Sequence, residues 1–248
     1  MELHGKVALI TGSSSGIGEV IAKKFLSQGA SVFGCGLEES STIKNENYEY
    51  KKADLTLFSQ AQNVVEECMK RFDQLDIVVN CAGITGVGTI ENTNAEEFER
   101  QFKVNVFAVY NVCKAAVPEL NKSKGAAIIN IASELGVKAI PERIAYCPSK
   151  AAVVMFTKCL AIECGPHIRV NGILPALTET PMTKARFEQA ENPEEFRERM
   201  NSRYILKRMC QSEDIAEGAL FLASQRSSYI TGDMLAICGG GHIYTFPD

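Results

Sequence analysis

VALITGSSSGIG, residues 7–18, joins an apolar run to a glycine-rich turn and then to the start of a helical pattern. The run is apolar at every position before Thr11, which is typical of a parallel strand buried on both faces. The apolar residues after the turn repeat with helical spacing, and a glycine stops the pattern: Ile17, Ile21, Ala22, Phe25, Leu26 and Gly29. A strand, a glycine-rich turn and a helix in this order predict the first unit of a nucleotide-binding α/β fold.

The glycines of the turn follow the spacing G-x-x-x-G-x-G, not the G-x-G-x-x-G of other dinucleotide-binding proteins. Glycine lets the backbone approach a pyrophosphate, while the N–H groups and the dipole of the helix face its charge. The alternative is a tight turn and helix cap without a ligand. We predict that the turn binds a coenzyme through Gly12, Ser14, Ser15, Gly16, Ile17 and Gly18.

Strand-like runs alternate with helical patterns along the rest of the chain, which predicts a doubly wound α/β fold with a parallel sheet and helices on both faces. The predicted strands are residues 7–11, 31–34, 48–53, 76–80, 126–131, 168–173 and 234–237. Further helices are predicted near residues 95–120, 144–163 and 213–223. No linker or composition shift divides the 248 residues, so we expect a single domain over 1–248.

Composition is that of an ordinary soluble protein, with 46% hydrophobic residues, 23% charged residues and a net charge of -4. No basic stripe indicates a nucleic-acid partner, and no apolar run of about 18 residues predicts a membrane span. Nine cysteines without C-x-x-C pairs, and three scattered histidines, favour reduced thiols and no metal site. We therefore expect a cytoplasmic protein.

The spacing Tyr-x-x-x-Lys occurs three times, at Tyr48/Lys52, Tyr110/Lys114 and Tyr146/Lys150. The first pair lies in a predicted strand, where four residues span about 13 Å and keep the two polar groups apart. On a helix the same spacing places both side chains on one face. Only the third pair is preceded by a serine at a strand end, Ser133, so we predict the site there.

With the glycine-rich turn, Asn80-Cys81-Ala82-Gly83, Asn105 and Ser133 in the same order, the chain resembles the short-chain dehydrogenase/reductase family over nearly its whole length. The resemblance implies a sheet ordered 3-2-1-4-5-6-7 and a homotetramer or homodimer. It also implies a catalytic tetrad made of Asn105, Ser133, Tyr146 and Lys150.

In that family pattern, Tyr146 is the general acid/base that exchanges a proton with the substrate oxygen. A phenol with a pKa near 10 is a poor base at neutral pH, so the Lys150 ammonium is expected to lower the pKa of Tyr146. Lys150 is also expected to hydrogen-bond the nicotinamide ribose. Ser133 orients the substrate oxygen, and Asn105 holds a water that links Lys150 to solvent.

The resemblance extends the coenzyme site beyond the turn. Asp54 is expected to accept a hydrogen bond from the adenine amine, with a helix cap as its alternative role. Small residues after the fourth strand leave room for the cofactor, although a plain turn explains them equally well. The expected coenzyme-binding residues outside the turn are Gly36, Asp54, Leu55, Asn80, Ala82, Gly83, Tyr146, Lys150, Pro175, Thr178 and Thr180.

The end of the second predicted strand bears on coenzyme choice. Gly36 and Leu37 occupy the positions where the family places Asp or Arg, so neither standard solution is present. Without a nearby cation, and with Glu38 within reach, a 2′-phosphate is poorly compensated. We therefore favour NAD(H) over NADP(H).

Substrate contacts are expected from Ile84 and Thr85, from the chain between Ser133 and Tyr146, and from a lid segment, residues 177–208. The predicted substrate residues are Ser133, Leu135, Ile140, Arg143 and Leu177, with Arg143 suited to a carboxylate or phosphate. These features favour an NAD(P)-dependent oxidoreductase that interconverts a secondary alcohol and a ketone, acting on a small molecule. Two alternatives are a coenzyme-binding regulator or scaffold without turnover, and a 3-oxoacyl reductase that uses NADPH.

Overall fold

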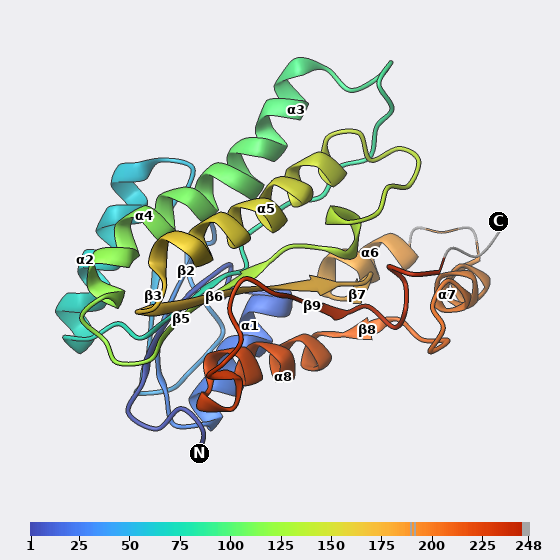
Figure 1. Ribbon diagram of the computed structural model, residues 1–248. Helices are drawn as coiled ribbons and strands as arrows, with labels where there is room; N and C mark the ends of the chain where they lie inside the picture. Colours follow the sequence, from blue (N-terminus) through green and yellow to red (C-terminus); the bar gives the residue numbers. More distant parts are fainter. Residues whose placement is uncertain (189, 191, 245–248) are drawn as a thin grey trace.

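A computed structural model describes residues 1–188, 190 and 192–244 of the chain. Its large sheet has seven parallel strands in the order β3-β2-β1-β4-β5-β6-β9 (Figure 1), which confirms the expected doubly wound topology. The strands are β1 (Val7–Thr11), β2 (Ser31–Gly36), β3 (Tyr48–Lys52), β4 (Ile77–Asn80), β5 (Ala126–Ile131), β6 (Ile168–Pro175) and β9 (Met234–Ile237).

Two strands run two residues further than the sequence pattern predicts. β2 continues to Gly36, which pairs with Lys52 of β3, and β6 continues to Pro175, which pairs with Ile237 of β9. Pairing with the neighbouring strand extends both past the last residue of the apolar pattern. The remaining predicted strand ends differ from the observed ones by at most one residue.

Helices cover both faces of the sheet (Figure 1). α1 (Gly16–Ser27) and α8 (Ser212–Ala223) lie on one face, and α2 (Phe58–Phe72), α4 (Ala108–Leu120) and α5 (Tyr146–Cys164) lie on the other. The side chains of β1 pack against the helices on both faces of the sheet. Leu9 packs toward α2 and α4, while Ala8 and Ile10 pack toward α1 and α8. Burial on both faces explains why the strand is apolar without alternation.

The predicted helix over residues 95–120 is interrupted by a π-helical turn. α3 (Ala95–Phe102) passes into the turn Lys103–Phe107 and then into α4. We expected Asn105 to lie in a regular α-helix. It lies instead in this wider π-helical turn. A widened turn of this kind shifts the direction of a side chain, and such turns often occur at functional sites.

The lid segment contains two helices and one of two short strands. It includes β7 (Thr178–Glu179), α6 (Pro181–Glu188) and α7 (Pro193–Ser202), and β7 pairs with β8 (Cys210–Gln211) just after it. Gln189 and Glu191 of this segment lie outside the described residues. Four buried side chains pack together, three from the segment and Met209 from just after it: Phe187, Met200, Tyr204 and Met209. None of the helices in the described ranges is long and apolar enough to cross a membrane.

Candidate active site

The glycine-rich turn is held against the end of β4. The Thr11 hydroxyl accepts hydrogen bonds from the N–H groups of Cys81 and Ala82, each at 3.0 Å. Gly12 adopts a φ of +66°, and a Cβ atom there would lie 3.0 Å from the backbone of Ala82. The predicted turn and the predicted Asn80–Gly83 segment therefore meet, at the edge where β1 and β4 end.

The N-terminus of α1 faces outward from this edge. Ser15 is the N-cap of α1, and its side chain makes no capping hydrogen bond, so it caps none of the first helical N–H groups. Such N–H groups are suited to an anion such as a pyrophosphate. Thr180 lies opposite, with its side chain 3.6 Å from the position that a Cβ atom on Gly16 would take. The turn and the start of the lid segment thus lie against each other.

The third Tyr-x-x-x-Lys pair forms the first turns of α5, beside the end of β5. The Lys150 side chain is 6% exposed, and its Nζ donates a hydrogen bond to the carbonyl oxygen of Ile131 at 3.0 Å. The same Nζ lies 6.0 Å from the centre of the Tyr146 ring. Ser133, which follows β5, contacts the Tyr146 hydroxyl through its side chain. These three predicted catalytic residues are therefore brought together.

Asn105 completes the group from the π-helical turn. Its side chain accepts from the N–H of Ile84 at 2.8 Å and donates to the carbonyl of Ile84 and to the Ser149 hydroxyl, both at 3.0 Å. A Cβ atom on Gly83 would lie 3.1 Å from the Asn105 Oδ1 and 3.4 Å from the Lys150 Nζ. Gly83 therefore leaves a cradle between the two polar groups that any larger residue would fill.

Burial dominates the electrostatics of the pair. It lowers the pKa of Lys150 to about 8 and raises the pKa of Tyr146, because each charged form loses hydration. Contact with Ser133 and the charge of Arg143 oppose the shift at Tyr146 without reversing it. The expectation that the pKa of Tyr146 is lowered is thus wrong for the protein without coenzyme. The cost of burying a phenolate exceeds the help that its neighbours give.

The other two Tyr-x-x-x-Lys pairs differ in their surroundings. Tyr48 and Lys52 lie on β3, where the Tyr48 hydroxyl hydrogen-bonds Ser13 at 3.1 Å. Tyr110 and Lys114 share a face of α4, with the Lys114 Nζ 5.8 Å from the Tyr110 ring centre, but Tyr110 is 44% exposed. The two helical pairs have similar geometry, so the burial of Lys150 and the contact of half-buried Tyr146 with Ser133 are what set the third pair apart.

The far end of the turn carries an acidic group. The Ser14 hydroxyl donates to the Glu38 carboxylate at 2.6 Å, and Gly36 lies beside both side chains. Asp54 is further along the same edge, but its Oδ1 accepts from the N–H and hydroxyl of Thr56, at 3.0 and 2.7 Å. Asp54 thus caps a local turn. Leu55 is buried below it.

The predicted substrate residues line the chain on either side of Tyr146. The N–H of Leu135 donates to the Ser133 hydroxyl at 3.1 Å, and Ile140 is half-buried. Arg143 pairs through its backbone with Gly88, which draws the loop after β4 toward the start of α5. Leu177 donates its N–H to the Tyr204 hydroxyl at 3.0 Å. Leu177 therefore contacts the core of the lid segment, through a tyrosine that the sequence analysis did not select.

The loop after β6 keeps its predicted place beside the turn. Pro175 is the last residue of β6, and the hydroxyl of Thr178 donates to the carbonyl of Ala176 at 2.9 Å. Thr180 pairs with Thr183, whose hydroxyl donates to the carbonyl of Thr178 at 2.8 Å. These bonds fix the loop as it leaves the sheet, so that Thr180 faces Gly16.

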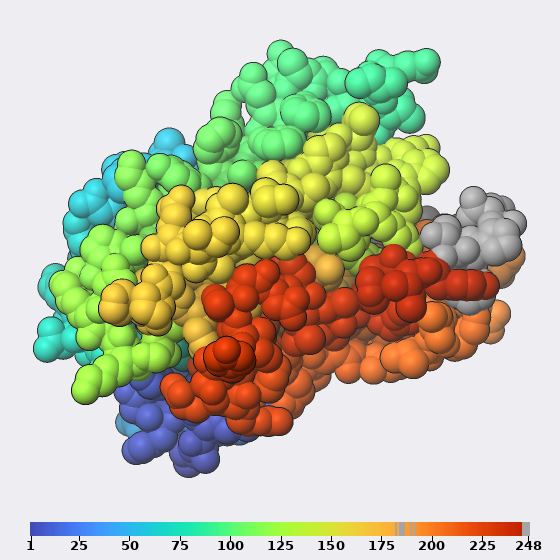
Figure 2. Space-filling view, viewed as in Figure 1, coloured from blue at the N-terminus to red at the C-terminus, as the bar shows by residue number. Residues whose placement is uncertain are grey.

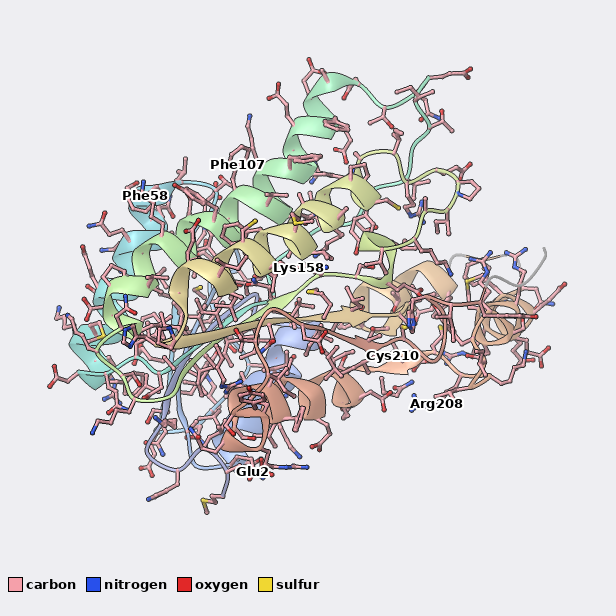
Figure 3. All side chains as sticks on the ribbon, viewed as in Figure 1. Glu2, Phe58, Phe107, Lys158, Arg208 and Cys210 are labelled. Carbon is pink, nitrogen blue, oxygen red and sulfur yellow. The ribbon has the colours of Figure 1, made fainter. Side chains whose placement is uncertain are left out.

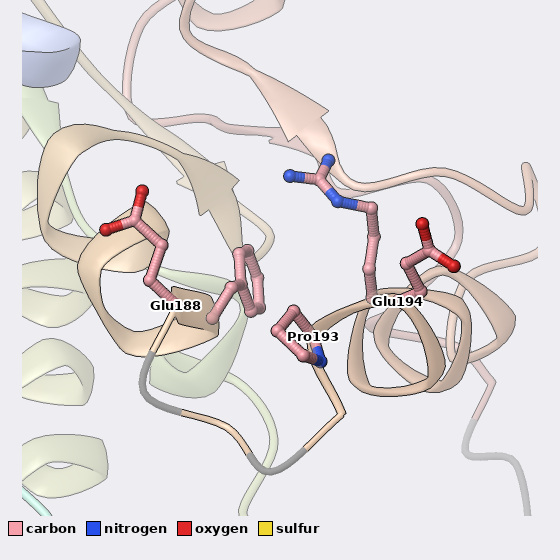
Figure 4. Close-up of a pocket in the computed structure, with 5 residues that line it drawn as sticks. Glu188, Pro193 and Glu194 are labelled. Carbon is pink, nitrogen blue, oxygen red and sulfur yellow. The ribbon is translucent and has the colours of Figure 1, made fainter.

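A pocket in the lid segment lies apart from these residues. It is formed between α6 and α7, as Figure 4 shows, and is lined by Phe187, Glu188, Pro193, Glu194 and Arg197. None of the predicted catalytic or coenzyme-binding residues lines it. Over residues 1–188, 190 and 192–244, no group of three or more His, Cys, Asp or Glu side chains is arranged to hold a metal ion.

Comparisons with known proteins agree with this arrangement. The model of a family described as enoyl-(acyl carrier protein) reductase matches residues 12–242. An uncharacterized oxidoreductase of Thermotoga maritima is 37% identical over 247 residues, which cover 97% of this chain and 98% of that protein. The 3-oxoacyl-[acyl-carrier-protein] reductase FabG of the same organism is 36% identical, and the match covers 97% and 99% of the two chains.

Solved structures share the whole fold. The ligand-free aldohexose dehydrogenase of Thermoplasma acidophilum has a TM-score of 0.93 and 30% identity, over 99% of this chain and 98% of that one. A 3-ketoacyl-(acyl-carrier-protein) reductase of Brucella melitensis, solved with NADH, has a TM-score of 0.88 and 31% identity, over 97% and 99% of the two chains. The similarity thus includes both the turn and the Tyr146 region.

The close approach of Gly12 to Ala82 gives a direct test of the coenzyme site. We expect Gly12→Ala to weaken NAD(H) binding by about tenfold or more, because its Cβ meets the Ala82 backbone at the place where the turn must fit. Gly5→Ala is the matched control. Gly5 has a similar φ of +73° but no atom within 4 Å of its Cβ position, so this variant carries the backbone strain alone. Fluorescence titration of both variants measures the difference, and equal affinities would show that the contact is unimportant.

Proposed function

The chain belongs to the short-chain dehydrogenase/reductase family, and we propose that it is a nicotinamide-coenzyme-dependent oxidoreductase that interconverts a secondary alcohol and a ketone. The observation that carries this proposal is the group formed by buried Ser133, buried Lys150 and half-buried Tyr146 beside the cradle at Gly83. A protein that only binds a coenzyme has no need for this group. We therefore favour catalysis over the regulator or scaffold.

The residues present fit a dinucleotide. The N-terminus of α1 offers N–H groups to the pyrophosphate, and the cradle at Gly83 leaves space between Asn105 and Lys150 for the nicotinamide ribose. Pro175, Thr178 and Thr180 would line the nicotinamide side. When bound, the coenzyme gives or accepts the hydride. The protein's own residues position the substrate and move the proton.

Tyr146 is suited to donate a proton. Because burial raises its pKa, the hydroxyl remains protonated at neutral pH and can protonate the carbonyl oxygen of a ketone. Its place at the N-terminus of α5 favours the phenolate that remains, since the helix dipole stabilises negative charge there. Ser133, in contact with the same hydroxyl, can orient the substrate oxygen.

Lys150 supplies the compensating positive charge. Its pKa of about 8 lies above neutral pH, so most of the side chains carry an ammonium group under ordinary conditions. The carbonyl of Ile131 holds this ammonium in place. We propose that the ammonium stabilises the Tyr146 phenolate during turnover and binds the coenzyme ribose. Asn105 would hold the water that links Lys150 to solvent.

A preference for NAD(H) over NADP(H) is proposed on the strength of Glu38. Its carboxylate lies beside Ser14 and Gly36, at the end of β2 where the family binds the adenosine ribose. A carboxylate can accept a hydrogen bond from a ribose 2′-hydroxyl, whereas a 2′-phosphate at the same place would be repelled. Glu38 is exposed, so solvent and salt weaken this repulsion without removing it.

The substrate is proposed to be a small molecule with a secondary alcohol or ketone group. Arg143 is half-buried, and its positive charge acts on Tyr146 by opposing the rise of the Tyr146 pKa. Arg143 is therefore near enough to the proton donor to pair with an anionic group on the substrate. A 3-oxoacyl reductase with NADPH is the second candidate, because relatives of similar length include 3-oxoacyl-[acyl-carrier-protein] reductases. The carboxylate of Glu38 favours the first proposal over the second.

We propose that the protein forms homotetramers or homodimers through α4 and α5. Several large apolar side chains on these helices and the adjoining turn are exposed: Phe107, Tyr110, Met155 and Ile162. Phe107, at the end of the π-helical turn, is labelled on the outer helical layer in Figure 3. Burying such side chains favours association.

The nine free cysteines fit a reducing compartment, for which we propose the cytoplasm.

Replacement of the proton donor tests the proposed chemistry. We expect Tyr146→Phe to lower kcat by roughly 10²- to 10⁴-fold, while the dissociation constant for coenzyme changes less than about twofold. Tyr110→Phe is the control, because it removes the same hydroxyl from an exposed Tyr-x-x-x-Lys pair. The measurement is coenzyme oxidation and reduction over a panel of alcohols and ketones. Wild-type turnover by Tyr146→Phe would disprove the assignment.

Coenzyme choice is tested at Glu38. We expect Glu38→Gln to reduce the preference for NAD(H) over NADP(H) about tenfold, equivalent to ~1.4 kcal/mol, because it removes the charge that opposes a 2′-phosphate. Glu39→Gln is the control, since the Glu39 carboxylate pairs with Lys52 and lies one residue further along. Binding titrations with both coenzymes give the ratio. Tighter NADP(H) binding by the wild-type protein would overturn the preference.

A further inference from the structure

Glu134 is a buried acidic residue to which the proposed chemistry assigns no task. It directly follows Ser133, starts the short 3-10 turn Glu134–Gly136 and is 6% exposed. One carboxylate oxygen, Oε1, accepts a hydrogen bond from the Tyr204 hydroxyl at 3.4 Å. The other, Oε2, is buried without a hydrogen-bond partner among the described residues. Burying such a group costs free energy, so its place beside Ser133 needs an explanation.

Tyr204 connects this carboxylate to the start of the lid segment. It lies just after α7 and is 5% exposed, and its hydroxyl accepts a hydrogen bond from the N–H of Leu177 at 3.0 Å. One hydroxyl therefore joins Glu134 to Leu177, with Tyr204 itself coming from the far end of the lid segment. The beginning and the end of that segment are tied at one point, next to the turn that carries Ser133.

The C-terminal turn closes over the same point. A Cβ atom on Gly241 would lie 2.1 Å from the Glu134 Oε2, so only glycine leaves room for the carboxylate. Lys138 donates to the carbonyl of Gly241, and the N–H of Ile205 donates to the carbonyl of Gly239 at 2.9 Å. Figure 2 shows the red C-terminal segment between the yellow-green chain that precedes α5 and the orange α7.

Packing alone does not account for this arrangement. An apolar side chain at position 134 would fill the space without leaving a buried oxygen unpaired, and a phenylalanine at 204 would preserve the apolar contacts with Met200 and Met209. The polar groups instead form a chain from Leu177 through Tyr204 to Glu134. Lys138 is the cation that faces this carboxylate. Polar chains of this kind fix one arrangement among several that packing would allow.

We propose that Glu134 is a positioning residue that, through the Tyr204 hydroxyl, fixes the Leu177 end of the lid segment against the Ser133 turn. The proposal rests on the proposed function, since the lid segment is the part that we expect to contact substrate. Loss of the link should loosen the lid segment and weaken substrate binding. The coenzyme turn should be unaffected, because it does not belong to this chain of hydrogen bonds. Tyr146 is outside the chain as well, and Glu134 acts on it only through its charge, which is one of the smaller causes that raise the pKa of Tyr146.

Three variants separate the link from its surroundings. Tyr204→Phe removes only the hydroxyl, and Glu134→Ala removes the carboxyl group. Glu134→Gln keeps an acceptor oxygen for Tyr204 and loses only the charge, so it is the conservative variant that should restore the link. Tyr229→Phe, at a fully exposed tyrosine, is the control for loss of a hydroxyl elsewhere.

Hydrogen–deuterium exchange of the full-length protein measures the link without any substrate. We expect amides near 177–180 to exchange about fivefold faster in Tyr204→Phe and Glu134→Ala than in the wild type, since one hydrogen bond is lost. The amides of α1 should be unchanged, and Glu134→Gln and Tyr229→Phe should behave like the wild type. Wild-type exchange near 177–180 in Tyr204→Phe would overturn the proposal.

Kinetics with ethyl acetoacetate as the probe ketone give the second readout. In Tyr204→Phe and Glu134→Ala we expect KM to rise about five- to tenfold while kcat changes less than about threefold, and Glu134→Gln should restore KM. A fall in kcat with an unchanged KM would contradict a positioning role. If the wild-type protein turned over neither this ketone nor any in the panel, the proposed function would fail. Hydrogen exchange would still decide whether Glu134 holds the lid segment.

Discussion

The contact between the ends of β1 and β4 is the constraint on which the site depends. The Thr11 hydroxyl accepts hydrogen bonds from the N–H groups of Cys81 and Ala82, and Gly12 packs directly on the Ala82 backbone. This contact brings the glycine-rich turn against the segment that ends in Gly83. Because Gly83 borders Asn105 and Lys150, the same contact sets the distance between the nucleotide turn and the proton-transfer group. A larger residue at Gly12 or Gly83 would therefore move the coenzyme-binding turn away from the residues that transfer the proton.

Burial then sets the protonation states of Tyr146 and Lys150 by shifting their pKa values. The same loss of hydration keeps Tyr146 protonated and brings the pKa of Lys150 to about 8, so that donor and cation coexist near neutral pH. Tyr110 and Lys114 repeat the spacing on α4 without this effect, since Tyr110 is exposed. A motif of two residues therefore acquires its function from the elements packed around it, here β5, α5 and the π-helical turn.

Local patterns predicted the fold well, because strand, turn and helix each depend on neighbouring residues. The strand order and the meeting of Ser133, Tyr146 and Lys150 followed from the family resemblance. Contacts between distant residues could not be predicted: Tyr204 reaches Glu134 across 70 positions, and no local pattern marks either residue. The direction of the pKa shift at Tyr146 was wrong for a related reason. The sequence shows the charges near a residue, but burial arises from the packing of several elements.

The central claim is that the glycine-rich turn and the Tyr146–Lys150 pair form one coenzyme-dependent site. A crystal structure of the protein with NAD⁺ tests it most directly. We predict the pyrophosphate on the N–H groups of the Gly12–Gly18 turn and a nicotinamide ribose hydroxyl within about 3 Å of the Lys150 Nζ. The account would be contradicted by a coenzyme bound elsewhere, or by one bound at the turn with its nicotinamide ribose out of reach of Lys150.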